Sequence, residues 1–424
     1  MENKEWVLHV DGDAFFASCE VARRPDLFRL PVVVGEERGI VTALTYDAKH
    51  LGIKRGDPIF KIKNEYKEVS ILSSHFEAYN KYATALYNLL SEDRNILKVE
   101  RYSIDECFAV IVGNKNDLEE KVQNLKNKIQ NKLGITYSFG ISINKTLAKV
   151  ASKMNKPNGL SLLITQESIN KVLSNTKVEN IWGIGNATYS KLYAKGTVTA
   201  LDYIKSDPRD LLKADYNKSV HETYLELCGK KVFNVNEINP IQKSLQSTRT
   251  FLSKTKDKAI ILSEISRNLE VAMSELRAKN LYTDRISFYF KSAVAGTSSS
   301  CGEIMVSNYT NSSNKFINNI EQMFDKLSNG GTRVYKGSGV IAHNLIQRGD
   351  LPVSLFDDQE IAIEEDNKLN SAIDKLRNKF GFNIIEYASS QNAINKREGY
   401  KAKREIKDNY IAGLPYTYLG TIYN

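Results

Sequence analysis

The chain contains few cysteines and no long apolar segment. Its four cysteines, Cys19, Cys107, Cys228 and Cys301, are far apart and form no C-x-x-C pair, which argues against a disulfide framework or a cysteine-based zinc site. Reduced thiols in a cytosolic protein are the simplest account of this pattern. The N-terminus has no secretory hydrophobic region, and no apolar run is long enough to span a membrane. These absences argue against the secreted, disulfide-rich and membrane-spanning classes.

The composition predicts several domains and an anionic partner. The chain has 424 residues, of which 42% are hydrophobic, so two or more domains with substantial cores are expected. Its net charge is +9, which favours a negatively charged partner. Between residues 243 and 350, 15 Lys and Arg stand against 9 Asp and Glu. A localised basic segment is typical of nucleic-acid binding, although an ordinary basic surface would give the same count.

Two acidic motifs indicate a site for divalent cations. A short apolar strand, Val7 to Val10, ends in Asp11-Gly12-Asp13, and Asp105-Glu106 stands between two apolar, β-prone runs. Neighbouring side chains of a strand point to opposite faces, so Asp105 and Glu106 serve one site only if the chain turns there, as at a hairpin tip. Clustered carboxylates suit Mg²⁺, and two such ions can promote phosphoryl transfer. Taken singly, each motif is also typical of a solvated turn.

The pattern of the N-terminal part predicts helices packed on one face of an antiparallel sheet. We expect strands at residues 6–10, 31–35, 99–112 (a hairpin) and 136–143, and helices at 14–22, 47–51, 77–90, 118–133 and 145–156. Residues 164–232 are predicted to be mainly helical, with a glycine turn at Trp182-Gly183-Ile184-Gly185. Residues 233–242 contain Pro240 and several Asn, and are predicted to be a linker.

The next segment predicts a second βαββαβ unit without sequence similarity to the first. We expect strands at residues 244–252, 285–291, 301–307 and 332–343, and helices at 257–280 and 315–327. Two helices on one face of such a sheet leave the other face free for a partner. The tail from Asp357 begins acidic, has a helical stretch at 368–380, and is expected to be partly ordered at best.

Four longer blocks of sequence carry a resemblance to a known family. They comprise residues 11–20 with 24–27, residues 48–58, residues 102–108, and residues 140–149 with 156–159. In order and spacing they resemble the Y-family translesion DNA polymerases, and within them the catalytic subunit of bacterial DNA polymerase V and its Gram-positive relatives. The resemblance covers roughly residues 5–355.

This resemblance implies a multidomain α+β fold shaped as a right hand. Its parts would be a ferredoxin-like palm, small fingers, a helical thumb and a βαββαβ little finger. By residue number they would be the palm at 1–14 and 75–163, the fingers at 15–74, the thumb at 164–232, a linker at 233–243, the little finger at 244–347, and a clamp-binding peptide with the C-terminal tail at 348–424. The little finger so implied matches the second βαββαβ unit predicted from periodicity.

The resemblance also implies an activity, namely template-directed addition of deoxynucleotides to a primer opposite damaged template. The partners would be primer-template DNA and deoxynucleoside triphosphates, and the protein would act as a monomeric core in the bacterial cytoplasm, at the nucleoid, in DNA repair and the SOS response. Asp11, Asp105 and Glu106 would be catalytic and, with the Gly12 carbonyl, would hold two Mg²⁺ ions. Asp13 would at most support these ligands from behind, and capping of a helix is its expected role.

Five residues are implied in binding the incoming nucleotide, namely Phe15, Phe16, Tyr46, Lys49 and Lys156. Tyr46, Lys49 and Lys156 fit positions that grip the β- and γ-phosphates. Many members carry Arg in place of Lys49, and Lys offers a point charge where Arg offers a bidentate fork. The Phe16 ring would exclude a ribose 2′-hydroxyl. Taken alone, Lys49 is typical of a solvated helix face and Phe16 of core packing.

The resemblance further implies contacts with DNA and with a sliding clamp. Residues 182–186 resemble a helix-hairpin-helix turn, in which Gly183 and Gly185 let backbone N–H groups approach a phosphate. In the little finger, Arg249, Lys254 and Lys256 would meet the duplex backbone, so DNA binding should weaken with salt.

Residues 351–356 look like a clamp-binding peptide, with Pro352 in the usual place of Gln. Leu355 and Phe356 would fill a pocket on the clamp. The alternative is a linker that packs on its own domain.

Two other classes of protein are compatible with parts of the pattern. A non-catalytic DNA-binding or clamp-associated protein would keep the shape and lose the chemistry, but Asp11, Asp105 and Glu106 are all present. A nucleotidyl cyclase also uses a palm-like sheet, paired acids and two metals. It would need neither the basic residues of 243–350 nor the glycine turn, and it would need no template.

Overall fold

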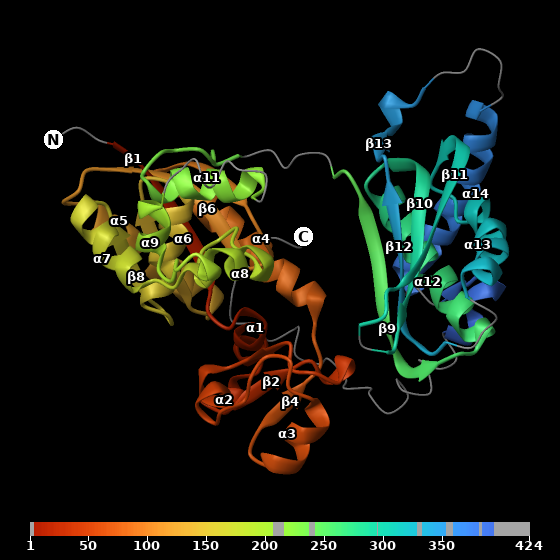
Figure 1. Cartoon of the computed structure of the whole chain (residues 1–424), viewed down its shortest axis with the longest axis horizontal. Helices are drawn as coiled ribbons and strands as arrows, with labels where there is room; N and C mark the ends of the chain where they lie inside the picture. The colour runs from red at the N-terminus through yellow and green to blue at the C-terminus, as the bar shows by residue number, and fades with distance from the viewer. Residues whose placement is uncertain are drawn as a thin grey trace. The chain divides into compact units, whose positions relative to one another are not determined.

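The computed structural model describes residues 4–206, 216–236, 242–294, 296–328, 333–352, 359–380 and 384–393 (Figure 1). These residues form two compact units, the first containing those up to 236 and the second those from 242 onward. Within these described ranges, no helix is both long and apolar enough to cross a membrane.

The first unit is built on a five-stranded sheet with the strand order β5-β6-β1-β7-β8. The strands are β1 (Lys4–Gly12), β5 (Ile96–Arg101), β6 (Glu106–Gly113), β7 (Tyr137–Ser142) and β8 (Leu160–Leu163). The first four strands have the order of a ferredoxin-like fold, as predicted. Strand β8 was not predicted, and because it runs parallel to β7 the expectation of a purely antiparallel sheet is wrong. Its four residues are too few to show a period.

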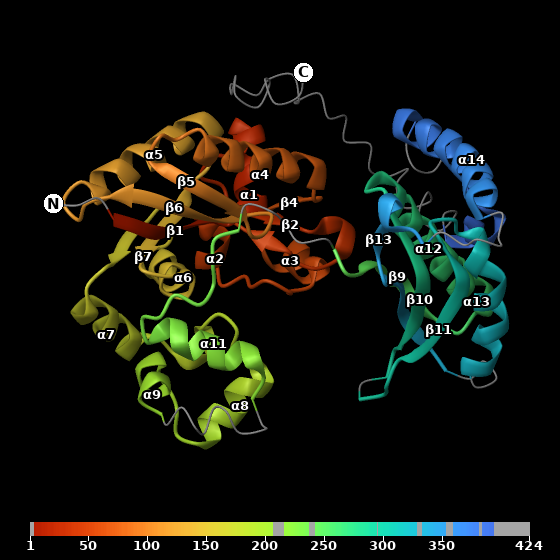
Figure 2. The same cartoon turned by 90° about the horizontal axis from the view of Figure 1, so that it is seen from above.

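Helices cover both faces of this sheet, so the prediction of helices on one face only is wrong (Figure 2). The first face packs against α4 (Phe76–Ser91) and α5 (Leu118–Leu133), and the opposite face packs against α6 (Lys145–Met154). Because strand side chains alternate, Trp6, Leu8 and Val10 enter the α4–α5 core, whereas Val7, His9 and Asp11 face α6. The alternation therefore brings Asp11 to the α6 side, at the end of β1.

Gly140 on β7 lets α6 lie directly on the sheet. A Cβ atom at this position would come within 2.2 Å of the Ala148 carbonyl oxygen and the Ser152 backbone nitrogen. Both contacts are with backbone, which cannot move aside as a flexible side chain can. The close approach of α6 to the sheet therefore depends on this glycine.

We expect Gly140→Ala to lower the free energy of unfolding by about 2 kcal/mol or more, because overpacking must push α6 off the sheet. Thermal or denaturant unfolding measures this. Gly349→Ala is the control, since nothing lies within 4 Å of the added methyl group there. Equal stability of the two variants would contradict the expectation.

The fingers are a small module joined to the palm through α1 (Phe15–Arg23). Their sheet has the order β3-β2-β4, from β2 (Val32–Val34), β3 (Ala43–Leu44) and β4 (Ser70–Leu72). Helices α2 (Tyr46–His50) and α3 (Ile59–Glu65) complete it. Of these elements only β2, with its run of valines, and the helices α1 and α2 were predicted. The strands β3 and β4 are two and three residues long and show no period.

The thumb is helical, as predicted. Its described helices are α7 (Gln166–Asn175), α8 (Asn186–Ala194), α9 (Ala200–Lys205) and α11 (Lys218–Leu227). Glu226 on α11 is fully buried and anchors the thumb to the palm. Its carboxylate accepts hydrogen bonds from the backbone N–H groups of Thr146 (2.9 Å), Val232 (2.7 Å) and Phe233 (2.9 Å). One acid thus joins the start of α6 to the chain that leaves the thumb.

The second unit is the βαββαβ domain that periodicity predicted. It contains β9 (Leu245–Thr255), α12 (Lys258–Ala278), β10 (Leu281–Ser292), β11 (Ser300–Thr310), α13 (Asn314–Leu327) and β12 (Tyr335–His343). The sheet order is β11-β10-β12-β9, and the short strand β13 (Ile346–Gln347) pairs with β10. Ile286, Phe288 and Phe290 face the helices and form the centre of its core, as their alternation predicted.

The described part of the C-terminal tail contains the helical stretch predicted at 368–380, within a longer helix. Helix α14 (Gln359–Phe380) and the turn at residues 388–390 belong to the second unit and pack on α12. The buried Arg377 guanidinium lies 2.6 Å from Glu270, and Arg277 makes two hydrogen bonds to Asp374. Ser390 Oγ also donates to Glu270 (2.5 Å). Asp374 and Arg377, in the stretch that was predicted to be helical, are therefore partners for charges on α12.

Candidate active site

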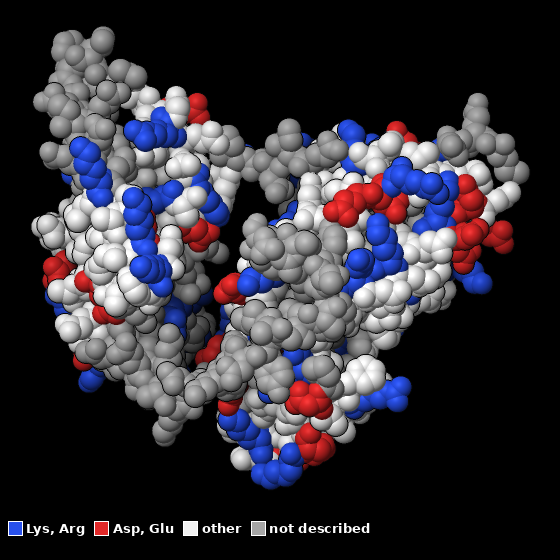
Figure 3. Space-filling model, turned by 180° about the vertical axis from the view of Figure 1, so that it is seen from behind, with Lys and Arg blue, Asp and Glu red and all other residues white. Residues whose placement is uncertain are grey.

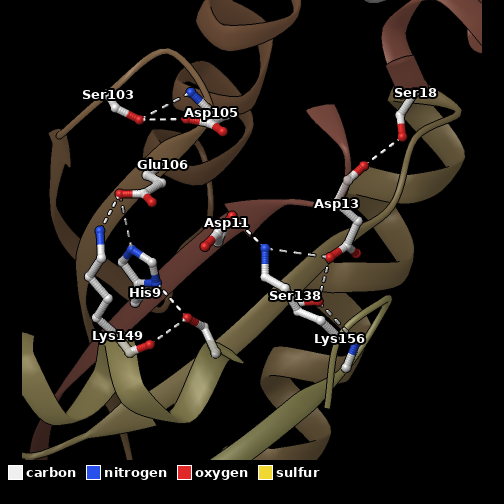
Figure 4. A network of polar contacts seen from close by, with 12 residues as sticks. His9, Asp11, Asp13, Ser18, Ser103, Asp105, Glu106, Ser138, Lys149 and Lys156 are labelled. Carbon is white, nitrogen blue, oxygen red and sulfur yellow. Dashed lines mark hydrogen bonds and ion pairs between the residues drawn. The ribbon is translucent and has the colours of Figure 1, made fainter. Parts of the chain in front are cut away.

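The structure places the three predicted acids at neighbouring strand ends (Figure 4). Asp11 on β1 pairs directly with Glu106 on β6, so their side chains leave the same face of the sheet. Asp105 precedes β6, and its carbonyl accepts a hydrogen bond from the Gly12 backbone N–H at 2.9 Å. Ser103 donates its N–H to the Glu106 carbonyl at 3.1 Å, which closes the predicted turn.

Each acid already has a partner in this arrangement. Lys156 Nζ lies 2.6 Å from Asp11 Oδ1, and Lys149 Nζ lies 2.5 Å from Glu106 Oε2. Asp105 Oδ1 accepts a hydrogen bond from Ser103 Oγ at 2.6 Å. In the ranges that the structure describes, no three His, Cys, Asp or Glu side chains converge closely enough to hold a metal ion. The backbone thus brings the acids together, while their side chains point to separate partners.

The donor set nevertheless suits a hard cation. Three carboxylates and the Gly12 carbonyl supply only oxygen ligands, as Mg²⁺ prefers. Two of the carboxylates are held by lysine ammonium groups, so positive charge is already favoured at both places. A bound cation must compete with Lys149 and Lys156 for these oxygens.

The two paired acids differ in their proton affinity. Burial raises the pKa of Glu106, but the hydrogen bonds and charges of His9 and Lys149 outweigh it, and the pKa falls to about 2. For Asp11, burial is the largest effect and outweighs the attraction of Lys156, so the pKa of Asp11 lies above its ordinary value. Glu106 is therefore firmly ionised near neutral pH, and Asp11 holds its charge less firmly.

His9 is a part of the site that the sequence reasoning missed. It is fully buried beneath Glu106, with its Nε2 at 3.7 Å from Glu106 Oε2 and its Nδ1 at 2.7 Å from Ser152 Oγ. Burial lowers the pKa of His9, which favours the neutral ring. The available signal was a histidine inside the otherwise apolar strand from Trp6 to Val10.

Asp13 does not cap a helix, contrary to expectation. Helix α1 begins after Ala14, which makes no side-chain cap. The Asp13 carboxylate instead accepts hydrogen bonds from Ser138 Oγ (2.8 Å) and the Asn158 backbone N–H (2.7 Å). It therefore braces the loop that carries Lys156, whose ammonium lies 3.7 Å from Asp13 Oδ1.

The predicted phosphate-binding residues lie beside the acids. Lys49 Nζ sits 3.9 Å from the centre of the Tyr46 ring. Burial, followed by the charges of Lys156 and Arg55, lowers the pKa of Lys49, so these three cations act on one another. Arg55, in the sequence block at residues 48–58, was not among the predicted phosphate-binding residues. Burial and then the charges of Asp13 and Asp11 raise the pKa of Tyr46 to about 12.

The two adjacent phenylalanines have different surroundings. Phe15 is buried in the palm core, so its side chain is not available to a nucleotide. Phe16 is partly buried and stacks on Tyr79, with ring centres 4.5 Å apart and planes 13° apart. The Tyr79 hydroxyl donates to Glu20 at 2.7 Å, which fixes that ring. Phe16 thus rests on a ring that is itself held in place, as its predicted role against a sugar hydroxyl requires.

We expect Phe16→Ala to raise incorporation of ribonucleotides relative to deoxynucleotides by about tenfold or more, because the ring no longer clashes with a 2′-hydroxyl. Single-nucleotide primer extension with matched ribo- and deoxynucleotides measures the ratio. Phe28→Ala is the control, since Phe28 is an exposed phenylalanine of the fingers. An unchanged ratio in Phe16→Ala would count against this role.

The predicted DNA contacts remain predictions. The residues named for them have different surroundings in the structure. Gly183 has φ +89°, and an added Cβ would meet Thr223 Oγ1 at 2.7 Å, so this glycine is required by the turn itself. Gly185 has open space around it. Arg249 pairs with Ser338, which faces α12 through Asn268, so Arg249 lies on the helix-covered side of its sheet.

The open face of the second unit carries polar and basic side chains that were not among the predicted DNA contacts. On β10 the buried positions alternate with Arg285, Ser287, Tyr289 and Lys291, which face away from the helices. Lys254 and Lys256 are exposed near the end of β9. In the view of Figure 3, basic side chains are spread over the surface and are interspersed with acidic ones. The predicted clamp-binding residues Leu355 and Phe356 fall outside the described residues.

Comparison with known proteins assigns the chain to a family. The sequence profile of the impB/mucB/samB family matches residues 10–153, and that of the family's C-terminal domain matches residues 242–355. Protein SamB of Salmonella typhimurium is 31% identical over 294 residues, which are 67% of this chain and 69% of that protein. This chain belongs to the impB/mucB/samB family.

Two further matches refine this assignment. Protein UmuC of Salmonella typhimurium strain LT2 is 29% identical over 405 residues, covering 92% of this chain and 95% of UmuC. The solved structure of a Y-family DNA polymerase chimera of Dbh and Dpo4 matches with a TM-score of 0.68 and 25% identity, covering 81% of this chain and 100% of the chimera. The impB/mucB/samB member described here is thus a Y-family translesion DNA polymerase related to UmuC, as the resemblance predicted.

Proposed function

We propose that this polymerase adds deoxynucleotides to a primer 3′ end opposite damaged template by a two-Mg²⁺ mechanism, in DNA repair and damage tolerance. The observation that carries the proposal is the pairing of Asp11 with Glu106 across β1 and β6, with Asp105 hydrogen-bonded to Gly12 next to them. When bound, the ions would supply the positive charge that activates the primer hydroxyl and stabilises the leaving pyrophosphate.

The protein's own residues would hold the reactants in place. Asp11, Asp105, Glu106 and the Gly12 carbonyl would bind the ions. The carboxylate of Asp13 keeps the loop before Asn158 in position through its hydrogen bond at 2.7 Å. None of these groups has to act as a nucleophile, since the primer supplies the attacking oxygen.

The cations of the fingers and palm would bind the triphosphate. Lys49, Arg55 and Lys156 influence one another's charge, and Tyr46 lies under the Lys49 ammonium at 3.9 Å. A triphosphate placed there would offer Lys156 a stronger anion than its present partner, Asp11. Substrate binding would then release Asp11 for a metal ion.

The basic second unit would contact the duplex through phosphates and not through bases, so affinity should fall steeply with salt. We propose that Tyr289 and Lys291 on its open face take part, with Lys254 and Lys256 near the end of β9. Binding of a sliding clamp by residues 351–356, and action at the nucleoid in the cytoplasm, are part of this proposal.

Primer extension with Mg²⁺ tests the proposal directly. A labelled primer is annealed to two templates that differ only in an abasic site at the first unpaired position. We expect extension on both templates, strict dependence on template and Mg²⁺, and no cyclic nucleotide from any nucleoside triphosphate. Absence of extension on the undamaged template would refute the proposed polymerase activity. Extension on the undamaged template with a stop before the abasic site would refute only the bypass of this lesion.

A further inference from the structure

An aromatic pair stands beside the Lys149–Glu106 ion pair. The ammonium of Lys149 lies 4.8 Å from the centre of the Tyr102 ring and 5.8 Å from that of Trp182. Aromatic faces attract a cation within about 6 Å of the ring centre. Lys149 therefore lies between two kinds of partner, the Glu106 carboxylate at 2.5 Å and the Tyr102–Trp182 pair.

The pair joins the thumb to the catalytic turn. Trp182 precedes the thumb glycine Gly183, and its Nε1–H donates to the Tyr102 hydroxyl at 2.9 Å. The two rings meet edge to face, with centres 5.5 Å apart. The ring of Phe233, where the chain leaves the thumb, also packs on Trp182, with ring centres 5.2 Å apart. Tyr102 lies three residues before Asp105, so the position of the thumb bears directly on the metal-binding turn.

The neighbouring lysine of α6, Lys145, is held by an acid of its own. Lys145, one turn earlier on α6, donates to both oxygens of Glu100 at 2.8 Å. Its ammonium lies 4.5 Å from the Phe108 ring centre and farther, at 5.8 and 5.9 Å, from those of Tyr102 and Trp182. Of the two buried lysines on this face of α6, Lys149 is thus the one that is paired with a predicted metal ligand.

We infer that the Tyr102–Trp182 pair receives the Lys149 ammonium when a divalent cation takes Glu106 Oε2. This inference rests on the proposed role of Glu106 as a metal ligand. A divalent cation close to that oxygen repels an ammonium group at 2.5 Å, and the flexible stem of lysine lets the group move. The aromatic pair that Lys149 already faces is a favourable place for it, and the charge of Lys145 near the same rings is balanced by Glu100. Trp182 is then a positioning residue that connects thumb placement to metal affinity.

Intrinsic fluorescence offers a direct test, because the chain has only two tryptophans. Trp6, the other one, is buried in the α4–α5 core on the opposite face of the sheet. The full chain is bound to primer-template with a dideoxy-terminated primer and a matched deoxynucleotide, and Mg²⁺ is added while tryptophan emission is recorded. Trp182→Phe isolates the signal of Trp182, and Glu106→Gln removes the exchange.

We expect a saturable, Mg²⁺-dependent change in emission that is lost in both Trp182→Phe and Glu106→Gln. Calorimetric titration of the same complex measures Mg²⁺ binding independently. Normal Mg²⁺ binding without a Trp182-dependent change would overturn this inference and leave the proposed function intact. Absence of Mg²⁺ binding to the wild-type complex would overturn both.

The Mg²⁺ concentration that gives half-maximal extension provides a second readout. We expect Lys149→Met to lower it, because the competitor is gone, and Trp182→Ala to raise it about threefold or more, because the displaced ammonium loses an aromatic face. Tyr193→Ala is the matched control, since Tyr193 is an exposed aromatic of α8 in the same thumb.

The affinity for primer-template separates this role from a purely structural one. If Trp182 only supports the thumb, Trp182→Ala weakens DNA binding and leaves the Mg²⁺ midpoint unchanged, which would overturn the inference. Tyr102→Phe and Trp182→Phe keep a ring at each position and guard against loss of folding, and each should move the midpoint in the direction of Trp182→Ala by a smaller factor. A lower Mg²⁺ midpoint in these variants would also overturn the inference.

Discussion

Asp105→Asn should reduce primer extension by on the order of 10³-fold while folding and DNA affinity stay close to those of the wild type. The same result is expected for Asp11→Asn and Glu106→Gln. Each change keeps the shape of the side chain and removes one negative oxygen, so it tests charge at the site and not packing. Single-turnover extension at saturating nucleotide, together with DNA binding by anisotropy, measures the two effects separately.

Asp105 is the most informative of the three, because its carboxylate is turned to Ser103 Oγ at 2.6 Å and not to the other acids. The Asp105 carboxylate must turn away from Ser103 to bind a cation. An asparagine side chain can also turn, but its neutral amide offers the cation no negative charge. Asp117→Asn is the matched control, since that aspartate pairs with the surface residue Lys121 far from the turn. Full activity in Asp105→Asn would remove the two-metal proposal.

Glu226→Ala should lower the free energy of unfolding of the first unit by about 3 kcal/mol or more. The change leaves three buried backbone N–H groups, those of Thr146, Val232 and Phe233, without their acceptor. Because these groups join the thumb to α6, we also expect the thumb to become the most easily digested part of the protein. Denaturant unfolding and limited proteolysis measure the two effects.

Glu222→Ala is the matched control for this change. Glu222 lies one turn earlier on the same helix and pairs only loosely with exposed Lys218, at 3.4 Å. An exposed pair of this kind contributes about 0.5 kcal/mol at most, so the control should stay close to the wild type. Similar losses in both variants would show that Glu226 does not anchor the thumb.

Regular elements of this fold could be predicted wherever a period ran long enough. Helix α5 was predicted to the residue, because its apolar positions recur every three to four residues and Gly134 ends it. The strands β3, β4 and β8 are only two to four residues long, so no alternation could reveal them. Helix α14 was underestimated because its stability comes from partners on α12, which lie about a hundred residues away in sequence.

The candidate site shows the same division between local and distant information. The acids, the turn and Phe16 could be found from short motifs, because strand geometry fixes where Asp11 and Glu106 point. The pairing of Lys156 with Asp11 joins residues 145 positions apart, so no local sequence pattern predicts it. Asp13 was misassigned for the same reason, since Ser138 and Asn158 compete successfully for its carboxylate.

The contact of α14 with α12 has a practical consequence for dissecting the protein. The family's C-terminal profile ends at residue 355, which invites cutting the polypeptide there. Such a fragment would remove Arg377 and Ser390 from Glu270, a fully buried acid, and would leave that carboxylate with the longer contact to Arg267 at 3.6 Å. Anyone who isolates the second unit should therefore retain the chain through residue 393, where the Ala393 N–H still reaches Ser263 Oγ at 2.8 Å.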